Sequence, residues 1–221
     1  MARLISAVCF DLDGVLIDTM PLHAQAWQET LKPLGLRISR REIYEWEGES
    51  GAVTARRFLA RMGPAPLPRQ ITALLRDKER RFSRLARQIH LDPHLRVALR
   101  QLSRRSMPLA LVTGTSSREV HRILTPDVRS LFDVIVTGDR VRHGKPHPEP
   151  YRTAFRRLGI PPSQTAVIEN APYGIHAARS AQAGWIIALA SSLPRRYLAA
   201  ADTIVSSTLL LAQWLLDKIS G

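Results

Sequence analysis

Five short runs of apolar and β-branched residues are typical of buried strands. They cover residues 4–10, 108–112, 133–136, 165–168 and 185–189. From the second run onward, each is followed by a segment with helical periodicity. Short apolar strands that alternate with helices predict an α/β protein with a Rossmann-like parallel sheet covered on both faces, and ligands of such sheets bind beyond the carboxyl ends of the strands.

This alternation fails between residues 18 and 90, where four consecutive segments have helical patterns, at 23–34, 41–46, 52–62 and 67–89. We interpret residues 18–90 as an inserted α-helical cap domain, and residues 1–17 together with 91–221 as the core domain. Because the insertion leaves directly after the first strand, we expect it to lie over the strand ends as a lid.

The last cap helix has the clearest pattern. One face carries six apolar residues, Ile71, Leu74, Leu75, Phe82, Leu85 and Ile89. Another face carries four arginines, Arg76, Arg80, Arg84 and Arg87. We interpret the arginines as a solvated face. A second amphipathic helix, over residues 209–216, is expected to pack on the sheet.

The composition is that of a globular protein. Of the 221 residues 45% are hydrophobic and 23% are charged, with 15 Pro and 12 Gly. The single Cys9 excludes an internal disulfide and a cysteine metal cluster, which favours the reducing cytoplasm. No apolar run approaches the ~20 residues of a membrane span. We therefore expect a cytoplasmic protein, with no membrane partner and a monomeric state.

The net charge is unusual, because 32 Lys and Arg against 19 Asp and Glu give +13. Such a charge attracts phosphate esters, nucleic acid or anionic membranes without specifying which. A bias in codon composition toward arginine produces the same excess without any partner. With 6% aromatic residues and no recognisable nucleic-acid-binding motif, a non-catalytic nucleic-acid-binding protein is only an outside alternative, and nucleic acid is not an expected partner.

Two carboxylates follow the first strand in the sequence Asp11-Leu12-Asp13-Gly14. At that point the chain leaves extended geometry, so both side chains can turn toward one crevice. Like charges in a buried site need a nearby cation, and Mg²⁺ prefers such oxygen ligands. The pair therefore predicts a metal site.

Three more predicted strand ends carry complementary groups. Thr113 to Ser117 opens a helix near Arg118 with hydroxyl and N–H groups that can bind an anion. Gly144-Lys145-Pro146 places a cation in a stiff loop, where it can compensate a phosphoryl charge. Glu169-Asn170 adds two oxygen-bearing side chains. These groups, in this order, indicate phosphoryl chemistry at the crevice.

Four motifs together resemble those of the haloacid dehalogenase superfamily of phosphoryl-transfer enzymes: residues 10–16, Val-Thr-Gly at 112–114, Gly144-Lys145-Pro146 and residues 167–170. The resemblance covers nearly the whole chain. The helical insertion, with Asp18-Thr19 and residues 23–27 at its start, resembles the cap of the beta-phosphoglucomutase-like branch.

The resemblance implies a role for each matching residue. Asp11 would be the nucleophile that forms an aspartyl phosphate, and Asp13 the acid and base whose backbone carbonyl also binds Mg²⁺. Thr113, the Gly114 N–H and Lys145 would hold the phosphoryl oxygens. The second aspartate favours phosphoryl transfer over dehalogenation.

Further binding roles accompany these. Thr115, Arg118 and His23 are candidates for substrate binding. His23 would assist proton transfer or close the cap on the substrate, although its helical spacing with Trp27 also fits a packed hinge. The expected substrate is a small phosphorylated metabolite.

The sequence departs from the family pattern in two places. The fourth motif has Glu169-Asn170 where the family most often has Glu-Asp, so either residue is a candidate metal ligand beside Asp11 and Asp13. The cap turn, residues 47–51, carries Glu47 and Glu49 where beta-phosphoglucomutases place a Lys-Gly turn and an Arg for a distal phosphate. We therefore expect a Mg²⁺-dependent phosphatase, with a sugar-phosphate mutase as the alternative.

Other side chains leave two interpretations open or receive no role. Tyr44 and Trp46 line the substrate pocket or belong to the core of the cap. His143 and His147 bracket Lys145, but a histidine in a loop is usually only solvated, and we assign them no role.

Overall fold

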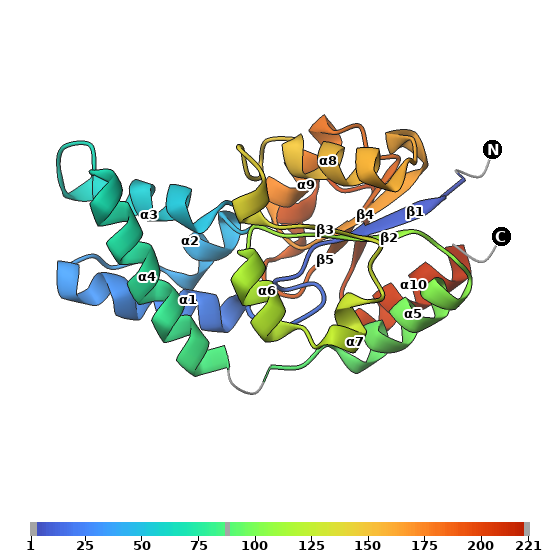
Figure 1. Cartoon of the computed structure of the whole chain (residues 1–221), viewed down its shortest axis with the longest axis horizontal. Coiled ribbons are helices and arrows are strands. Elements are labelled where there is room, and N and C mark those ends of the chain that lie inside the picture. Colours follow the sequence, from blue (N-terminus) through green and yellow to red (C-terminus); the bar gives the residue numbers. More distant parts are fainter. Residues whose placement is uncertain (1–3, 87–88, 219–221) are drawn as a thin grey trace.

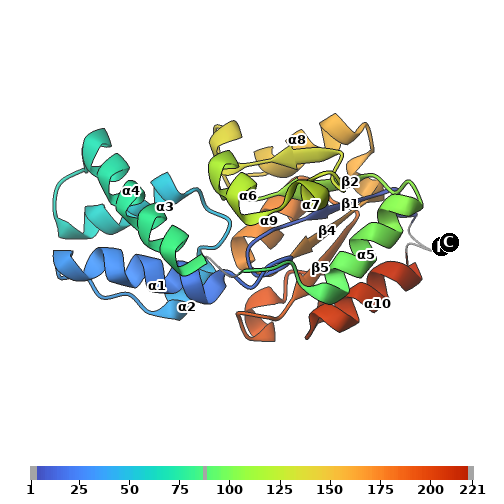
Figure 2. The same cartoon turned by 60° about the horizontal axis from the view of Figure 1, so that its bottom comes forward.

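The computed structural model describes residues 4–86 and 89–218, which form an α/β core with a helical lobe at one end (Figures 1 and 2). The core is built on a six-stranded sheet in the order β3-β2-β1-β4-β5-β6. All strand pairs are parallel. The strands are β1 (Ala7–Phe10), β2 (Leu109–Val112), β3 (Val134–Val136), β4 (Thr165–Glu169), β5 (Trp185–Leu189) and β6 (Thr203–Val205).

Helices cover both faces of the sheet (Figure 1). On one face lie α5 (Pro93–Arg104), α6 (Ser117–Ile123), α7 (Pro126–Arg129) and α10 (Thr208–Lys218). On the other lie α8 (Glu149–Leu158) and α9 (Pro172–Ser180). Each layer has its own apolar cluster, so the central strands are buried on both sides, which is why their sequences are almost wholly apolar.

The α/β fold with a parallel sheet is confirmed, and the five predicted strands lie within two or three residues of their expected positions. The sixth strand, β6, was not predicted. It has three residues and lies at the sheet edge, too short for a periodic pattern to show. Short 3₁₀ turns connect several elements: Gly138–Arg140, Pro162–Gln164 and Arg195–Leu198.

Between β1 and α5 the chain forms the helices of the lobe. They are α1 (Met20–Leu31), α2 (Arg40–Glu45), α3 (Gly51–Leu59) and α4 (Pro68–Leu85), with 3₁₀ turns at Lys32–Leu34 and Ala60–Met62. They enclose an apolar cluster separate from the two clusters of the core, in which Phe58 lies between Trp27 and Trp46. The separate cluster supports the proposed division into a cap of residues 18–90 and a core of residues 1–17 and 91–221.

Helix α4 ends at Leu85 rather than at Ile89. Of the four arginines predicted for its solvated face, Arg87 lies outside the described residues. Arg76, Arg80 and Arg84 are exposed, as expected. The apolar face also contains Lys78, which is only 5% exposed. None of the helices in residues 4–86 and 89–218 combines the length and hydrophobicity needed to cross a membrane.

Phe58 gives a test of the cap's apolar cluster. We expect Phe58→Ala to cost about 3–5 kcal/mol, because the side chain is fully buried between two tryptophans. Val53→Ala, on the same helix at a site that is 43% exposed, should change the free energy of unfolding by no more than about 0.5 kcal/mol. Urea unfolding followed by circular dichroism measures both. Equal effects would mean that this cluster does not stabilise the cap.

Candidate active site

The strand register sets the positions of the site. Phe10 of β1 lies level with Leu111 of β2 and with Ile168 of β4. One residue further along each chain, Asp11, Val112 and Glu169 therefore also lie level with one another. The Asp11 N–H continues the ladder by donating to the Ile168 carbonyl at 3.0 Å. Backbone pairing thus places an aspartate and a glutamate side by side at the carboxyl end of the sheet.

After Asp11 the chain turns sharply, and Leu12 accepts backbone hydrogen bonds from the N–H groups of residues 15, 16 and 17. Gly14 takes a positive φ of 83° in this turn. A Cβ atom at that position would lie 2.2 Å from Asn170 Nδ2, so only glycine fits. The turn buries Asp11 and Asp13 beside the end of β4.

Lys145 lies between the two carboxylates. Its Nζ donates to Asp11 Oδ1 at 2.6 Å, to Glu169 Oε1 at 2.6 Å and to the Val112 carbonyl at 3.0 Å. Burial alone would lower the pKa of Lys145, but the charges of Asp11 and Glu169 outweigh it and raise the pKa. Lys145 is therefore a permanent cation in the site.

Asp11 has one free oxygen. Oδ1 accepts from Lys145, while Oδ2 is buried and has no hydrogen-bond partner among residues 4–86 and 89–218. Burial raises the pKa of Asp11 to about 8; Lys145 opposes this shift, and the Glu169 and Asp13 carboxylates add to it. The site thus carries more negative charge than Lys145 compensates.

Asp13 is held differently, because hydroxyls and an imidazole surround its carboxylate. Oδ1 accepts from Thr19 at 2.5 Å and lies 3.1 Å from His23 Nε2. Oδ2 accepts from Thr115 at 2.6 Å and from Thr113 at 3.3 Å. Burial alone would raise the pKa of Asp13, but the His23 charge and these hydrogen bonds lower it well below the usual range. Asp13 is therefore a carboxylate in this structure.

The two residues of the fourth motif have different environments. Glu169 Oε1 accepts from Lys145 and, at 2.5 Å, from the Tyr151 hydroxyl, while Oε2 accepts from the Asn170 N–H at 3.1 Å. In the described part of the chain, both side-chain polar atoms of Asn170 are buried without a partner. The acceptors left free are Asp11 Oδ2 and Asn170 Oδ1, hard oxygen donors that fit Mg²⁺.

The Thr113 to Ser117 segment closes another side of the site. Gly114 is in close contact with the cap, since a Cβ atom there would lie 2.8 Å from the Gly48 carbonyl oxygen. Ser116 caps α6 by accepting from the Glu119 N–H at 3.4 Å. Arg118 is exposed and does not line the pocket. The structure therefore brings Gly114 and Thr115 to the pocket and leaves the candidate Arg118 outside it.

A cavity of about 330 Å³ lies between cap and core at these strand ends. The core contributes Gly114, Thr115 and Glu119, and the cap contributes residues that include His23, Trp46 and Lys78. Trp46 both lines the cavity and packs against Phe58 in the cap's apolar cluster. Tyr44 packs on that cluster and does not line the cavity. The His23 ring stacks on Phe82 with centroids 4.0 Å apart, which fixes its orientation toward Asp13.

Lys78 and Glu119 are among the pocket residues that were missed from the sequence. Lys78 Nζ lies 4.9 Å from the Phe82 ring centroid and 5.9 Å from that of Trp27, in cation–π contact. A lysine four residues from both Leu74 and Phe82, within an apolar face, was the available signal. Glu119 Oε1 is buried and has no partner within the described ranges. It gave no sequence signal, because its burial comes from the cap covering it.

The pocket wall is rich in carboxyl groups. Glu49 is paired with Arg57 at 2.8 Å and accepts from Thr54 at 3.1 Å. Burial raises the pKa of Glu47 well above its ordinary value, and the charges of Asp13 and Asp11 add to this. Burial also raises the pKa of Glu49, but there the charge of Arg57 opposes the shift.

Comparison with known proteins supports the motif assignment. A family model described as a haloacid dehalogenase-like hydrolase matches residues 5–182. The chain therefore belongs to the haloacid dehalogenase-like hydrolases, and the expectation of a phosphohydrolase of this family is confirmed.

Individual relatives agree with the family. The protein CbbY of Cereibacter sphaeroides is 32% identical over 92% of this chain and 93% of its own length. The fructose-1-phosphate phosphatase YqaB of Escherichia coli is 32% identical over 80% of this chain and 92% of its own. Among solved structures, a putative beta-phosphoglucomutase from Bacteroides vulgatus superposes with a TM-score of 0.86 at 30% identity, covering 100% of this chain and 92% of its own. The expected resemblance to the beta-phosphoglucomutase-like branch is confirmed.

Glu47 allows a test of the electrostatics of this wall. Because its pKa is raised in the folded state, the group favours folding at low pH, and this contribution is lost as the pH rises through the raised pKa. Glu47→Gln removes the ionisation. We expect the Tm of Glu47→Gln minus that of the unmodified protein to become more positive as the pH is raised from 5 to 9.

Glu45→Gln is the matched control, since it removes a carboxylate from a neighbouring position paired with Arg41 on the surface. It should not reproduce the pH-dependent gain. A constant Tm difference between Glu47→Gln and the unmodified protein at every pH would contradict the assigned electrostatics.

Proposed function

We propose that the protein is a Mg²⁺-dependent phosphatase that hydrolyses a small phosphorylated metabolite through an aspartyl phosphate on Asp11. The observation that carries this proposal is the environment of Asp11 at the carboxyl end of the sheet. One oxygen is bound to Lys145, and the other has no hydrogen-bond partner among the described residues. A carboxylate oriented in this way by a fixed cation is a suitable nucleophile for phosphorus. That the protein is a cytoplasmic monomer remains a prediction.

In the first step the Asp11 carboxylate attacks phosphorus, and the bond from phosphorus to the ester oxygen breaks. Asp13 must enter this step protonated; it donates that proton to the departing oxygen and regains one in the second step. In the second step Asp13 takes a proton from water, which attacks the aspartyl phosphate and releases inorganic phosphate. The carboxylate form of Asp13, stabilised by His23, Thr19 and Thr115, is the form that the second step needs.

Other residues hold the phosphoryl group during these steps. Lys145 supplies a fixed positive charge next to Asp11, and the Thr113 hydroxyl and the Gly114 N–H lie on the adjacent strand end. Glu169 and Tyr151 position Lys145 rather than contacting substrate, because Glu169 accepts from both. These groups are preorganised, so little rearrangement is needed when charge develops on the phosphoryl oxygens.

For Mg²⁺ we propose the ligands Asp11, Asn170 and the backbone carbonyl of Asp13. Bound there, the ion would neutralise the phosphoryl oxygens and the excess carboxylate charge. Asn170 is favoured over Glu169, since both Glu169 oxygens already accept hydrogen bonds whereas Asn170 Oδ1 has no partner among the described residues. The side chain of Asp13 is also fully engaged, which leaves its backbone as the contributor.

The pocket wall favours a phosphatase with a hydroxyl-bearing substrate. Glu79 and Glu119 line the cavity and, as carboxylates, would repel a second phosphate. The carboxyl groups of this wall, Glu47 included, can accept hydrogen bonds from sugar hydroxyls. The names of two relatives point to the same class of substrate. One is the phosphorylated carbohydrates phosphatase of Thermotoga maritima, and the other is a fructose-1-phosphate phosphatase.

A phosphomutase is the second candidate, and Lys78 is the observation that favours it. The sequence argument against a distal phosphate rested on the absence of a cation in the cap turn, but α4 brings Lys78 into the same pocket. Conversion of glucose 1-phosphate to glucose 6-phosphate, without release of phosphate, distinguishes a mutase from a phosphatase.

Asp11→Asn tests the nucleophile. We expect it to lower the turnover of phosphomonoesters by at least about 10³-fold, because an amide does not form the covalent intermediate, while circular dichroism shows an intact fold. Turnover retained by Asp11→Asn would contradict the proposed function.

A screen of phosphorylated sugars with Mg²⁺, measured by phosphate release, identifies the substrate. It should include a bisphosphate, since CbbY has been crystallised with xylulose-1,5-bisphosphate.

Asn170→Asp tests the metal ligand. An added anionic oxygen should lower the Mg²⁺ concentration for half-maximal activity by about tenfold, because the charge of the ligands sets metal affinity. Chelation of Mg²⁺ should abolish the activity of both proteins. Glu169→Gln is the comparison, and it should lower kcat more than it changes the Mg²⁺ requirement, since Glu169 positions Lys145. An unchanged Mg²⁺ requirement in Asn170→Asp would contradict the assignment.

A further inference from the structure

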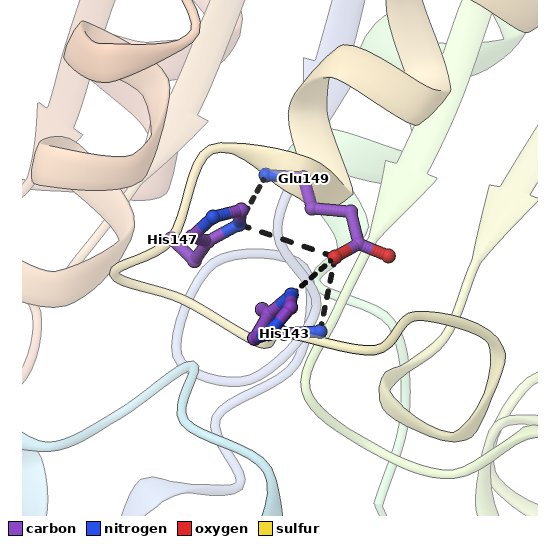
Figure 3. A group of neighbouring side chains, drawn as sticks. All are labelled: His143, His147 and Glu149. Carbon is purple, nitrogen blue, oxygen red and sulfur yellow. Dashed lines mark hydrogen bonds and ion pairs between the residues drawn. The ribbon is translucent and has the colours of Figure 1, made fainter.

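Three side chains converge at the surface, His143 and His147 of the loop between β3 and α8 and Glu149 at the start of α8 (Figure 3). Glu149 Oε2 lies 2.9 Å from His143 Nδ1 and 4.0 Å from His147 Nδ1. One nitrogen or oxygen of each side chain lies within 4.8 Å of those of the other two. The two imidazole rings are 4.7 Å apart between centroids. We propose that these three side chains form a binding site for a divalent transition-metal ion such as Zn²⁺.

The distances are close to those of a bound ion. Ligand atoms at ~2.0–2.1 Å from Zn²⁺ in a tetrahedral arrangement lie about 3.3 Å from one another. The observed separations fall on both sides of this value, so rotations of exposed side chains bring all three atoms onto one ion. Side-chain exposures of 64% for His143, 49% for His147 and 28% for Glu149 leave room for water as the fourth ligand.

Hydrogen bonds already orient the ligands. The Glu149 N–H donates to His147 Nδ1 at 3.2 Å, so this nitrogen carries no proton, and its electron pair can pass from this hydrogen bond to a metal. Glu149 is fixed in turn, because it accepts from the backbone N–H of Arg142 at 2.8 Å and of His143 at 3.1 Å. The loop is thus closed on the carboxylate before any ion binds, which lowers the entropic cost of assembling the site.

The donor set separates this site from the proposed magnesium site. Two imidazoles and one carboxylate suit Zn²⁺, Co²⁺ or Cu²⁺, whereas Mg²⁺ prefers oxygen donors such as those of Asp11 and Asn170. Lys145 lies two residues from each histidine, so an ion held by His143 and His147 would tie together both ends of the segment that presents Lys145 to Asp11.

Zinc binding to the full, tag-free chain tests the site. We expect one Zn²⁺ per chain by isothermal titration calorimetry in saturating Mg²⁺, and at least tenfold weaker binding in His143→Ala and in His147→Ala. Bound Zn²⁺ should raise the Tm of the unmodified protein, because it binds the folded state, and this rise should be lost in both variants. Co²⁺ in place of Zn²⁺ should give the visible absorption of a four-coordinate site.

His94→Ala is the matched control, an exposed histidine on α5 across the sheet from α8. It should bind Zn²⁺ as the unmodified protein does. Asp11→Asn should also keep its affinity for Zn²⁺, so the result is independent of the proposed phosphatase activity. Equal affinity in the unmodified protein, His143→Ala and His147→Ala, or loss of binding in Asp11→Asn, would overturn the proposal.

Discussion

The buried contact of Lys145 with Asp11 and Glu169 is the interaction on which the rest of the site depends. Its Nζ donates to both carboxylates at 2.6 Å and to the Val112 carbonyl at 3.0 Å, so three neighbouring strand ends converge on one cation. Charges withdrawn from water are costly unless they are paired and hydrogen-bonded. With two carboxylates on Lys145 and Asp13 beside them, the pairing is incomplete, and the proposed divalent ion would restore the balance of charge.

This constraint explains features of the sheet that would otherwise look unrelated. β1 occupies an interior position between β2 and β4, the arrangement that places Asp11 beside Glu169. Tyr151, at the start of α8, is buried under the sheet and donates to Glu169, which ties that helix to the same cluster. The apolar layers on both faces exclude water from the charges, and this strengthens their mutual interactions.

The sequence predicted the core of the fold, and most of the candidate site residues it named lie together in the structure, for an identifiable reason. Asp11 and Lys145 follow apolar strands at positions where a parallel sheet brings its ends together, so local pattern and topology agree. The choice between Glu169 and Asn170 was beyond the sequence, because it depends on which oxygens already accept hydrogen bonds. Lys78 was missed because its contribution requires α4 to pack over the strand ends, a tertiary contact that helical periodicity does not encode.

The contact between cap and core separates the charged groups at the strand ends from the upper wall of the cavity. At Gly48, whose φ is 86°, a Cβ atom would lie 2.6 Å from Lys145 Cδ, and at Gly114 one would lie 2.8 Å from the Gly48 carbonyl oxygen. The cap turn therefore rests directly on the residues that would hold the phosphoryl group, and no side chain fits between them. In the proposed function, substrate contacts beyond the phosphate would fall to groups farther up the cavity wall, Glu47 and Lys78 of the cap and Glu119 of the core. Changes at those positions can alter the substrate while the buried charges at the strand ends stay the same.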